Sequence, residues 1–430
     1  MDSKLDKFYK KTYSERLTAL LEAEVITQEQ YDELTNTQLN LSPDNGTHMI
    51  ENYIGNYSLP YGLAFNFLVN DKEYLVPMAV EEPSVIAAAS NGAKIVAKNG
   101  GFKTTVHNRE MIGQVVVKNS SDLVQDKKAL ENAKDELIKL ANEAYPTIVK
   151  RGGGANHGEV RIVDGDEDEG IDSYLVFHLH VDTQEAMGAN MLNTMLEAIA
   201  PTIESLTSGE VLMSILTNLA TESLVTATCE LTPETLAAER FSGEEVRDRI
   251  AESSKYAYVD PYRAATNNKG IMNGLDAVVV ATGNDWRAIE AGAHAYSVKD
   301  GQYRSLTKWR VNEAGNLTGE LTLPLPIATV GGSIGYHPGA QLSKVILGNP
   351  NAKELAQVIA SVGLAQNLAA IKALSTSGIQ KGHMALQAKS LAINAGATGD
   401  EIDKVTEKLI DNEKMNLDIA SNFLEEIRSN

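Results

Sequence analysis

The sequence predicts an α+β fold with a large helix-rich domain, an inserted ferredoxin-like domain and a mobile helical C-terminal flap. Three observations predict this architecture. The chain has 430 residues, more than one ordinary hydrophobic core accommodates. Residues 111–217 alternate strand-like and helical patterns in the order β-α-β-β-α, whereas the sequence on either side is mainly helical. Two glycines within residues 377–383 interrupt the helical tail.

The amino-acid composition argues against several classes of protein. The 38 Lys and Arg residues against 58 Asp and Glu residues give a formal net charge of −20, which argues against a nucleic-acid binder. Cys229 is the single cysteine, so an internal disulfide and a multi-cysteine zinc site are excluded. The first residues lack the apolar core of a secretory signal, and the longest apolar runs are far shorter than the ~20 residues of a membrane span. We therefore expect a cytoplasmic protein.

The first part of the large domain comprises residues 1–110. It opens with a helical arm in which leucines recur at helical spacing. Short apolar runs broken by Gly and Pro indicate strands and turns in residues 51–83. A helix then follows Pro83 and ends near Gly100. Its alanine and serine side chains would let another backbone or a cofactor come close, and a tightly packed interior helix is the plainer interpretation.

Residues 111–217 form the predicted ferredoxin-like domain. Their acidic hairpin tip, residues 164–170, resembles a calcium loop, but it lacks Gly at the sixth position and Glu at the twelfth, so we expect a solvated turn. The predicted strands are residues 115–117, 159–163 and 174–181, and the predicted helices are residues 123–144 and 187–199.

The second part of the large domain, residues 218–376, resumes the helical pattern around a few strands. We expect one strand at residues 277–281, followed by a turn that carries Asp285, and two more at residues 309–311 and 317–323.

Residues 377–430 form the predicted flap. Gly378 and Gly382 flank a short polar link between two helices, which is typical of a hinge. His383 lies at this hinge, where protonation near neutral pH would suit a mobile acid. A loop histidine without function is the alternative.

Three further patterns place ionisable groups where chemistry uses them. Glu82 precedes the helix start marked by Pro83, where it is either a simple cap or an acid. Residues 263–274 concentrate an Arg, a Lys and three amides in a predicted loop, which would hold a carboxylate and polarise a carbonyl or be an ordinary surface loop. Asp285 at a strand end is either part of a ligand site or a turn aspartate.

Two histidines have the spacing of metal ligands. His178 and His180 lie on one face of a predicted strand, yet no nearby cysteine or third histidine completes a ligand set. We therefore favour structural roles and predict no metal. Cys229 lies in an apolar run and is predicted to be buried and unreactive.

Two segments suggest a nucleotide. Lys150 and Arg151 precede three glycines, a combination that can approach phosphates. Residues 185–190 open a helix with small side chains, which suits a pyrophosphate at a helix N-terminus, although no G-x-G-x-x-G fingerprint follows a strand. The residues alone thus indicate a two-domain α+β protein for which a nucleotide-dependent enzyme is one interpretation.

Six segments, in this order, resemble the soluble bacterial class II 3-hydroxy-3-methylglutaryl-CoA (HMG-CoA) reductases. The resemblance covers most of the chain and is strongest from residue 51 to about residue 397. A single segment is a weak match, whereas six in family order are specific. The segments are residues 51–55 (ENYIG), 77–84 (PMAVEEPS), 185–190 (EAMGAN), 268–270 (NKG), 282–285 (TGND) and 382–384 (GHM).

The resemblance implies a reaction and four catalytic residues. HMG-CoA would be reduced through mevaldyl-CoA and mevaldehyde to mevalonate and CoA by two NADPH, in the mevalonate pathway of isoprenoid precursor synthesis. Lys269 would stabilise the oxyanion, and Asp285 would keep Lys269 charged and oriented. Glu82 would supply a proton to the aldehyde, and His383 would protonate the departing CoA thiolate.

The resemblance also implies binding residues and a homodimer whose active sites lie at the subunit interface, with no metal. Two positions depart from the family pattern, because Glu185 replaces the usual Asp and Asn267 the usual His. NADPH is our expected cofactor, with NADH as the alternative. The predicted substrate residues are Ser84, Arg263, Asn273, Glu51 and Gly55. The predicted nucleotide residues are Glu185, Ala186, Met187, Gly188, Ala189, Asn190 and Asn218, with Lys150 and Arg151 for the 2′-phosphate.

Two other functions remain open at this point. The same enzyme run in reverse would oxidise mevalonate with NAD. A non-catalytic acyl-CoA or nucleotide binder would keep the fold without the reaction. A thiolase-like acyl transferase is disfavoured, because Cys229 lacks the surroundings of a nucleophile.

Overall fold

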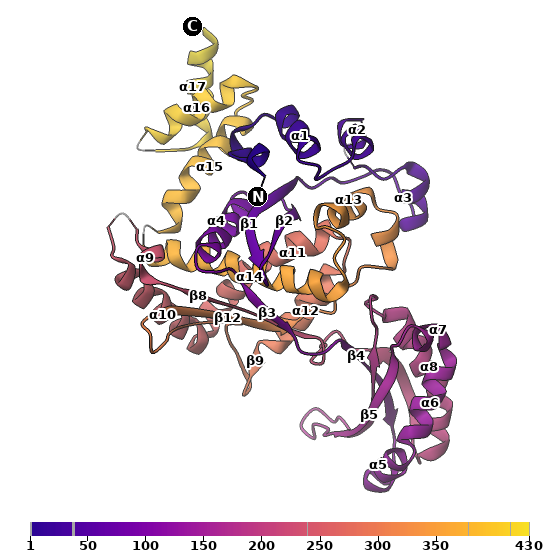
Figure 1. The fold of residues 1–430 in the computed structure, drawn as a ribbon. Helices are drawn as coiled ribbons and strands as arrows, with labels where there is room; N and C mark the ends of the chain where they lie inside the picture. Colours follow the sequence, from indigo (N-terminus) through magenta and orange to yellow (C-terminus); the bar gives the residue numbers. More distant parts are fainter. Residues whose placement is uncertain (1, 37–38, 239, 377, 413, 430) are drawn as a thin grey trace.

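The computed structural model describes residues 2–36, 39–238, 240–376, 378–412 and 414–429, and only the backbone of residues 379–386. Figure 1 shows a large central body, a smaller sheet domain beside it and a group of C-terminal helices at the opposite end. The protein is therefore a mixed α+β structure, as predicted.

The large body is built from two stretches of chain. The first contains η1 (Ser3–Leu5), η2 (Phe8–Lys10), α1 (Tyr13–Glu22), α2 (Gln28–Asn36), α3 (Pro43–Met49), β1 (Tyr61–Val69), β2 (Lys72–Ala79), α4 (Val85–Ala97) and β3 (Lys103–Val106). The second contains β8 (Leu224–Leu231), α9 (Pro233–Leu236), α10 (Gly243–Val259), α11 (Pro261–Ala281), α12 (Trp286–Tyr296), β9 (Val298–Lys299), β10 (Gln302–Tyr303), β11 (Thr307–Val311), β12 (Leu317–Pro324), η3 (Gly332–Gly335), α13 (Pro338–Ile346) and α14 (Ala352–Ser375).

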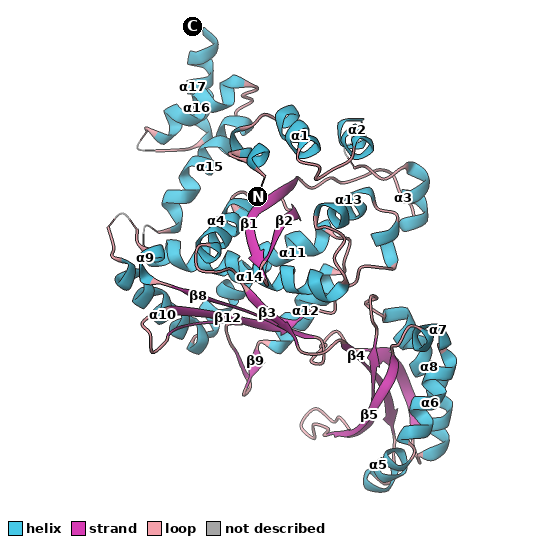
Figure 2. Ribbon diagram, in the orientation of Figure 1, coloured by secondary structure: helices cyan, strands magenta, loops and turns pink. Residues whose placement is uncertain are grey.

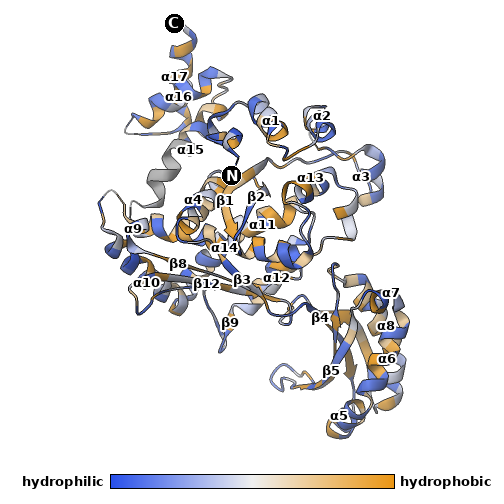
Figure 3. Ribbon diagram, in the orientation of Figure 1, coloured by the Kyte–Doolittle hydropathy of each residue, from blue (hydrophilic) through white to orange (hydrophobic). Residues whose placement is uncertain are grey.

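Helix α14 is the centre of this body. Asn351 and Glu354 form a capping box at its start, and apolar side chains then occupy most of its surface. By length and composition it is the one helix of the described chain that could cross a membrane, but 78% of its most apolar window is buried inside the protein. Figure 3 shows hydrophobic residues gathered where α14, α11, β1 and β2 meet. The burial identifies α14 as a core helix of this body.

Small residues allow the central helices to pack closely. A Cβ on Gly92 of α4 would clash with the carbonyl oxygen of Ala365 in α14. The predicted close approach at α4 is therefore a contact between two helix backbones. Gly274 of α11 makes a second close contact with α14, because a Cβ there would lie 3.0 Å from the Gln366 side chain.

The body also contains a four-stranded sheet, in the order β11-β12-β8-β3, and a separate β1–β2 hairpin. The predicted strands at residues 309–311 and 317–323 lie in β11 and β12. Cys229 on β8 is buried, as predicted, and burial raises the pKa of its thiol to about 12, which disfavours the reactive thiolate.

One region was predicted wrongly. Residues 263–274 form helix rather than a loop, and residues 277–281 continue the same helix rather than forming a strand. Asp260 caps α11 by accepting a hydrogen bond from the Arg263 amide, and Pro261 occupies its first turn. A short apolar run fits a strand and a buried helix end equally well, and here the helix forms.

The smaller domain is an antiparallel sheet with helices on one face (Figure 2). The strand order is β5-β6-β4-β7. Its apolar face packs on the helices, whereas none of the described helices covers the opposite face (Figure 2). The elements are β4 (Glu110–Lys118), α5 (Leu123–Asn132), α6 (Lys134–Ala144), α7 (Pro146–Lys150), β5 (Gly154–Val163), β6 (Tyr174–Asp182), α8 (Ala189–Leu206) and β7 (Glu210–Leu216).

The C-terminal helices α15 (Ile379–Asn394), α16 (Asp400–Ile410) and α17 (Leu417–Ser429) pack around a small core of their own. This core includes Ala388, Val405, Leu409 and Leu424. The predicted polar link is shorter than expected, because Gly382 and His383 lie within α15.

Candidate active site

An ion pair joins two of the predicted catalytic residues. The Lys269 Nζ donates a hydrogen bond to Glu82 Oε2 at 2.8 Å. Lys269 extends from α11, and Glu82 lies between β2 and α4, so residues 187 positions apart meet. Their side chains are 63% and 36% exposed, which leaves both groups accessible to a ligand. An oriented ammonium beside a carboxylate can bind a carbonyl oxygen and move a proton.

Two buried amides fix the part of α11 that carries Lys269. Asn268 is fully buried, donates from Nδ2 to the Arg304 carbonyl at 2.9 Å and accepts from the Leu306 amide at 2.9 Å. Asn267 donates from Nδ2 to Thr307 Oγ1 at 3.1 Å. Residues 304–307, which lead into β11, therefore hold this turn of the helix, and the side-chain amides of Asn267 and Asn268 are hydrogen-bonded.

The network continues into α14. Asn367 donates from Nδ2 to Asn267 Oδ1 at 2.9 Å and accepts from Trp309 Nε1 at 2.8 Å. All three side chains are buried. Asn367 and Trp309 were not predicted from the sequence, because only the fold brings them to α11.

Ser84 occupies a strained backbone position beside the ion pair. Its φ of 75° places it in the left-handed region just before α4, where a serine rarely lies. Its Oγ is buried and has no hydrogen-bond partner within the described part of the chain. Strain and an unpaired hydroxyl two residues from Glu82 are typical of a ligand site.

Two further predicted substrate residues lie on α11. Asn273 follows Lys269 by four positions, so the two side chains share a face of the helix. Arg263 lies in the first turn and is half-buried, and desolvation lowers the pKa of its guanidinium. One helix thus presents a cation and an amide on the face of the ion pair, with a second cation nearer its start.

Asp285 lies at a helix start rather than at the predicted strand end. Its Oδ1 caps α12 by accepting from the Ala288 amide at 3.1 Å. Asn284 fixes the preceding turn through hydrogen bonds with both the amide and the carbonyl of Ala328. Among the contacts of the described residues, no ion pair joins Asp285 to Lys269.

A carboxyl pair joins α11 to α12, and no pattern in the sequence indicated it. Asp276 Oδ1 is buried, whereas the Glu290 side chain is 34% exposed. Burial and a hydrogen bond with Glu290 raise the pKa of Asp276 far above its usual range. Glu290 Oε2 lies 3.5 Å from His294 Nε2, and His294 Nδ1 lies 2.7 Å from the Tyr303 hydroxyl. The Asp276 side chain therefore keeps a proton at neutral pH.

The predicted nucleotide segment, residues 185–190, joins β6 to α8. Gly188 precedes α8 with a φ of 95°, a conformation that favours glycine, and Thr183 packs against it. The Glu185 carboxylate is already engaged, because its Oε2 accepts from Thr329 Oγ1 at 2.5 Å and from the Ala352 amide at 2.9 Å. Glu185 thus links the small domain to the first turn of α14.

A buried arginine lies against the same segment. Arg109 donates from Nη2 to the Ala186 carbonyl at 3.2 Å, and its Nε and Nη1 have no partner among the described residues. Desolvation lowers the pKa of its guanidinium, although Glu185 and Asp182 oppose this effect. Arg109 was not predicted as a site residue, because only its burial beside this loop distinguishes it.

Lys150 and Arg151 are exposed at the end of α7. The glycines that follow lie against the start of the nucleotide segment, since Gln184 Nε2 donates to the Gly152 carbonyl at 3.4 Å. Asn218, in contrast, lies after β7 and packs against Gly292 of α12. A Cβ added to Gly292 would lie only 2.5 Å from the Asn218 carbonyl oxygen. The fold therefore places the glycines after the two basic residues, but not Asn218, against residues 182–184.

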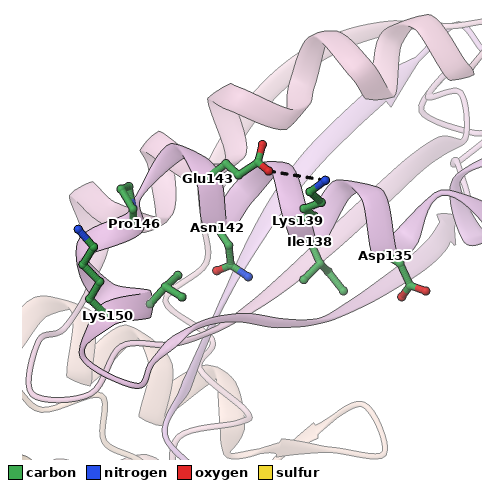
Figure 4. A pocket seen from close by; sticks show the side chains of 8 residues that line it. Asp135, Ile138, Lys139, Asn142, Glu143, Pro146 and Lys150 are labelled. Atoms are coloured by element: carbon green, nitrogen blue, oxygen red, sulfur yellow. Dashed lines mark ion pairs between the residues drawn. The ribbon is translucent and has the colours of Figure 1, made fainter.

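A shallow groove of about 560 Å³ runs along α6 and α7. Figure 4 shows Lys150 at one end and the Lys139–Glu143 ion pair along it. The predicted catalytic residues do not line this groove.

The remaining predicted residues lie elsewhere on the surface. Glu51 and Gly55 are exposed in the segment between α3 and β1, next to the fully exposed Ile54. The His383 side chain lies outside the described part of the structure.

Comparisons with known proteins find the same family along most or all of the chain. The family model for hydroxymethylglutaryl-coenzyme A reductase matches residues 12–388. A 3-hydroxy-3-methylglutaryl-coenzyme A reductase of Archaeoglobus fulgidus is 44% identical over 429 residues, which cover 100% of this chain and 96% of the relative. A probable reductase of the same name from Borreliella burgdorferi is 34% identical over 396 residues, which cover 90% of this chain and 89% of the relative.

Solved structures of proteins with the same name are also similar to this chain. A 3-hydroxy-3-methylglutaryl-coenzyme A reductase from Streptococcus pneumoniae aligns with a TM-score of 0.84 and 50% identity, covering 99% of this chain and 100% of that one. A second structure, of the class II enzyme from the same organism bound to NADPH in open conformations, aligns with a TM-score of 0.82 and 50% identity over 97% of this chain and 100% of that one. With the matched family model and these relatives, the chain belongs to the class II hydroxymethylglutaryl-coenzyme A reductase family.

Proposed function

We propose that this protein reduces HMG-CoA to mevalonate and free CoA with two NADPH, supplying isoprenoid precursor synthesis. The observation that carries the proposal is the Lys269–Glu82 ion pair, which joins two motifs that lie far apart in the sequence. An oxyanion stabiliser and a proton donor are the two groups that successive reductions of a thioester and an aldehyde require.

Lys269 acts on the carbonyl oxygen in both reductions. Its ammonium offers three donors, one of which Glu82 holds, so the others remain for the substrate. As negative charge develops on the oxygen, the cation stabilises it. Asp285 supports this charge, and Glu82 delivers the proton that converts the alkoxide of the aldehyde reduction into the alcohol of mevalonate.

The hydroxymethylglutaryl end is held by residues around this pair. The free Oγ of Ser84 and the amide of Asn273 bind its hydroxyl and carboxylate, and Arg263 neutralises the carboxylate charge. The segment from Glu51 to Gly55 binds the CoA portion. His383 protonates the departing thiolate, which prevents it from attacking the aldehyde again.

The small domain fits a dinucleotide. The two unpartnered nitrogens of buried Arg109 lie beside the segment that opens α8, which is the arrangement that a phosphate would complete. Residues 185–190 and Asn218 would contact the nucleotide, and Lys150 and Arg151 would bind the 2′-phosphate of NADPH. When bound, NADPH supplies the hydride for each reduction.

The remaining proposals concern assembly and movement. The exposed ion pair and the exposed apolar side chains of residues 49–59 support a homodimer in which a second subunit covers the active site. The separate core of α15–α17 supports a C-terminal flap that carries His383 and opens for nucleotide exchange. The absence of cysteines other than the buried Cys229 supports a cytoplasmic location.

A matched pair of lysine variants tests the proposal. Lys269→Ala removes the cation from the reacting oxygen, so kcat for HMG-CoA reduction should fall by about 10²–10³-fold or more. Lys255→Ala removes an exposed lysine that pairs with Glu252 on α10, and its kcat should equal that of the unmodified protein. Equal activity of the Lys269 variant and the control would overturn the proposed role, and absence of reductase activity in the unmodified protein would overturn the proposed function.

A further inference from the structure

A second cluster of ligand-type side chains lies on the small sheet, on the face opposite its helices. His178 and His180 alternate along β6 and so point to the same face, and Glu159 lies opposite His178 in the register of β5 with β6. Potential ligand atoms of these three residues all lie within 4.8 Å of one another. The sequence showed the two histidines, but the third ligand comes from the neighbouring strand.

His180 is not explained as a satisfied structural histidine. Its side chain is buried, with 8% of the residue exposed, and its Nε2 has no hydrogen-bond partner in the described part of the chain. The other ring nitrogen, Nδ1, lies 3.6 Å from Glu110 Oε2. Metal-ligating histidines commonly bind the metal through one ring nitrogen while the other contacts a carboxylate, and His180 has both features.

His178 is oriented by the strand that flanks β6 on the side away from β5. Gln114, opposite it on β4, places its side-chain amide 2.9 Å from His178 Nε2. The pKa of His178 is lowered to about 4, mainly by burial. Burial is also the main reason why the pKa of His180 is lowered. Burial thus disfavours the charged, non-ligating form of both imidazoles.

The charges around the cluster favour a cation. Glu159, Glu110 and Glu222 interact electrostatically with His180, and Arg161 interacts with His178. His157 packs edge-on against His180 and opposes its protonation. The three carboxylates thus outnumber the guanidinium.

We propose that Glu159, His178 and His180 bind one divalent transition-metal ion, for which Zn²⁺ has the best-matched chemistry. Two imidazole nitrogens and one carboxylate oxygen are a known zinc ligand set, and the ligand atoms need to approach by only about 1–2 Å to reach bonding distance of a common ion. Water completes the tetrahedron. The ion would join β5 to β6, so it would stabilise the small domain. The reductase chemistry proposed above does not use it.

Metal titration of the tag-free full-length chain tests this proposal. After removal of metal with a chelator, calorimetry with Zn²⁺ should show one site per chain, and Co²⁺ should give the visible absorption bands of a tetrahedral site. Saturating Zn²⁺ should also raise Tm, because the ion binds only the folded sheet. The absence of saturable binding near one equivalent would overturn the proposal.

Variants identify the ligands. Glu159 is exposed, so Glu159→Gln should fold normally and weaken Zn²⁺ binding at least 10-fold. His180→Asn should abolish the Co²⁺ bands, and Glu110→Gln should weaken binding by about 10–100-fold through His180. His48→Gln, an exposed histidine on α3, is the matched control and should bind like the unmodified chain. Unchanged affinity in Glu159→Gln and Glu110→Gln would place the metal elsewhere and contradict the proposal.

Discussion

Single residues of this protein perform separable tasks. Lys269 is exposed and pairs with the partly exposed Glu82, whereas Asn267 and Asn268, immediately before Lys269, are buried and hydrogen-bonded. Substitution of Lys269 should therefore change catalysis with little effect on stability. Substitution of the amides should reduce stability first, because buried donors and acceptors lose their partners.

Asp276 makes stability depend on pH. The folded protein holds its proton at neutral pH, whereas the unfolded chain releases it near the ordinary carboxyl pKa of ~4. Above pH ~4 the folded state therefore binds more protons than the unfolded state, and this group's contribution to stability falls as pH rises towards the raised folded pKa.

Asp276→Asn should remove that dependence. Urea unfolding at pH 5.5 and pH 8 should show a larger loss of unfolding free energy with rising pH in the unmodified protein than in the variant, by up to ~1.4 kcal/mol per pH unit. Asp71→Asn, an exposed carboxylate paired with Lys103, serves as the control. Parallel behaviour of Asp276→Asn and the unmodified protein would show that Asp276 is ionised in the folded state.

At the scale of elements, α11 positions the active site because α14 and the loop before β11 hold it. Asn367 of α14 is the shared partner of Asn267 and Trp309. Asn367→Ala leaves a buried carbonyl oxygen and a buried indole N–H without their partner. We expect it to lower the free energy of unfolding by about 2–4 kcal/mol in urea titrations.

The control for this variant is Asn132→Ala, which truncates an exposed asparagine in the last turn of α5. It should cost less than ~0.5 kcal/mol. If the two variants had equal stability, the buried network would not be what holds α11.

The helices and strands show which structural features could be predicted from the sequence and which could not. The helix after Pro83 and the strands of β11 and β12 were predicted correctly, because their punctuation and periodicity are local. Residues 263–281 were predicted wrongly, because Gly270 and Gly274 resemble loop signals. Gly274 instead gives α11 room beside Gln366 of α14, a requirement that only the packed structure reveals.

Some residues of the candidate site could also be predicted from the sequence, and others could not. Glu82 and Lys269 were found from motifs that resemble a family, and the fold then brought them together. Arg109 and Asn367 were missed, because each acquires its character from burial against residues far away in the sequence. Asp276 was missed, because its raised pKa comes from burial and from Glu290 on the next helix. The third metal ligand, Glu159, comes from a strand register that periodicity alone does not specify.

At the scale of the whole molecule, the exposed segment between α3 and β1 is the strongest sign of a second subunit. Ile54 and Tyr57 are almost entirely exposed in the single chain, which is unfavourable in water. Ile54→Asp would place a charge in the proposed interface. We expect sedimentation to show dissociation into monomers at concentrations where the unmodified chain is dimeric.

Another largely exposed apolar residue, outside this segment, provides the comparison. Val124→Asp on α5 of the small domain should leave the sedimentation coefficient and the activity unchanged. An unmodified chain that is monomeric and fully active would contradict the dimer.

The proposed function requires that one site carries out both reductions of the same substrate. The decisive experiment follows NADPH absorbance after addition of HMG-CoA while the released CoA thiol is titrated in the same sample. We expect two NADPH to be oxidised for each CoA released. No NADPH oxidation with HMG-CoA, together with no NAD reduction on addition of mevalonate and CoA, would contradict the proposal and identify the protein as a binder that has kept the fold of the family.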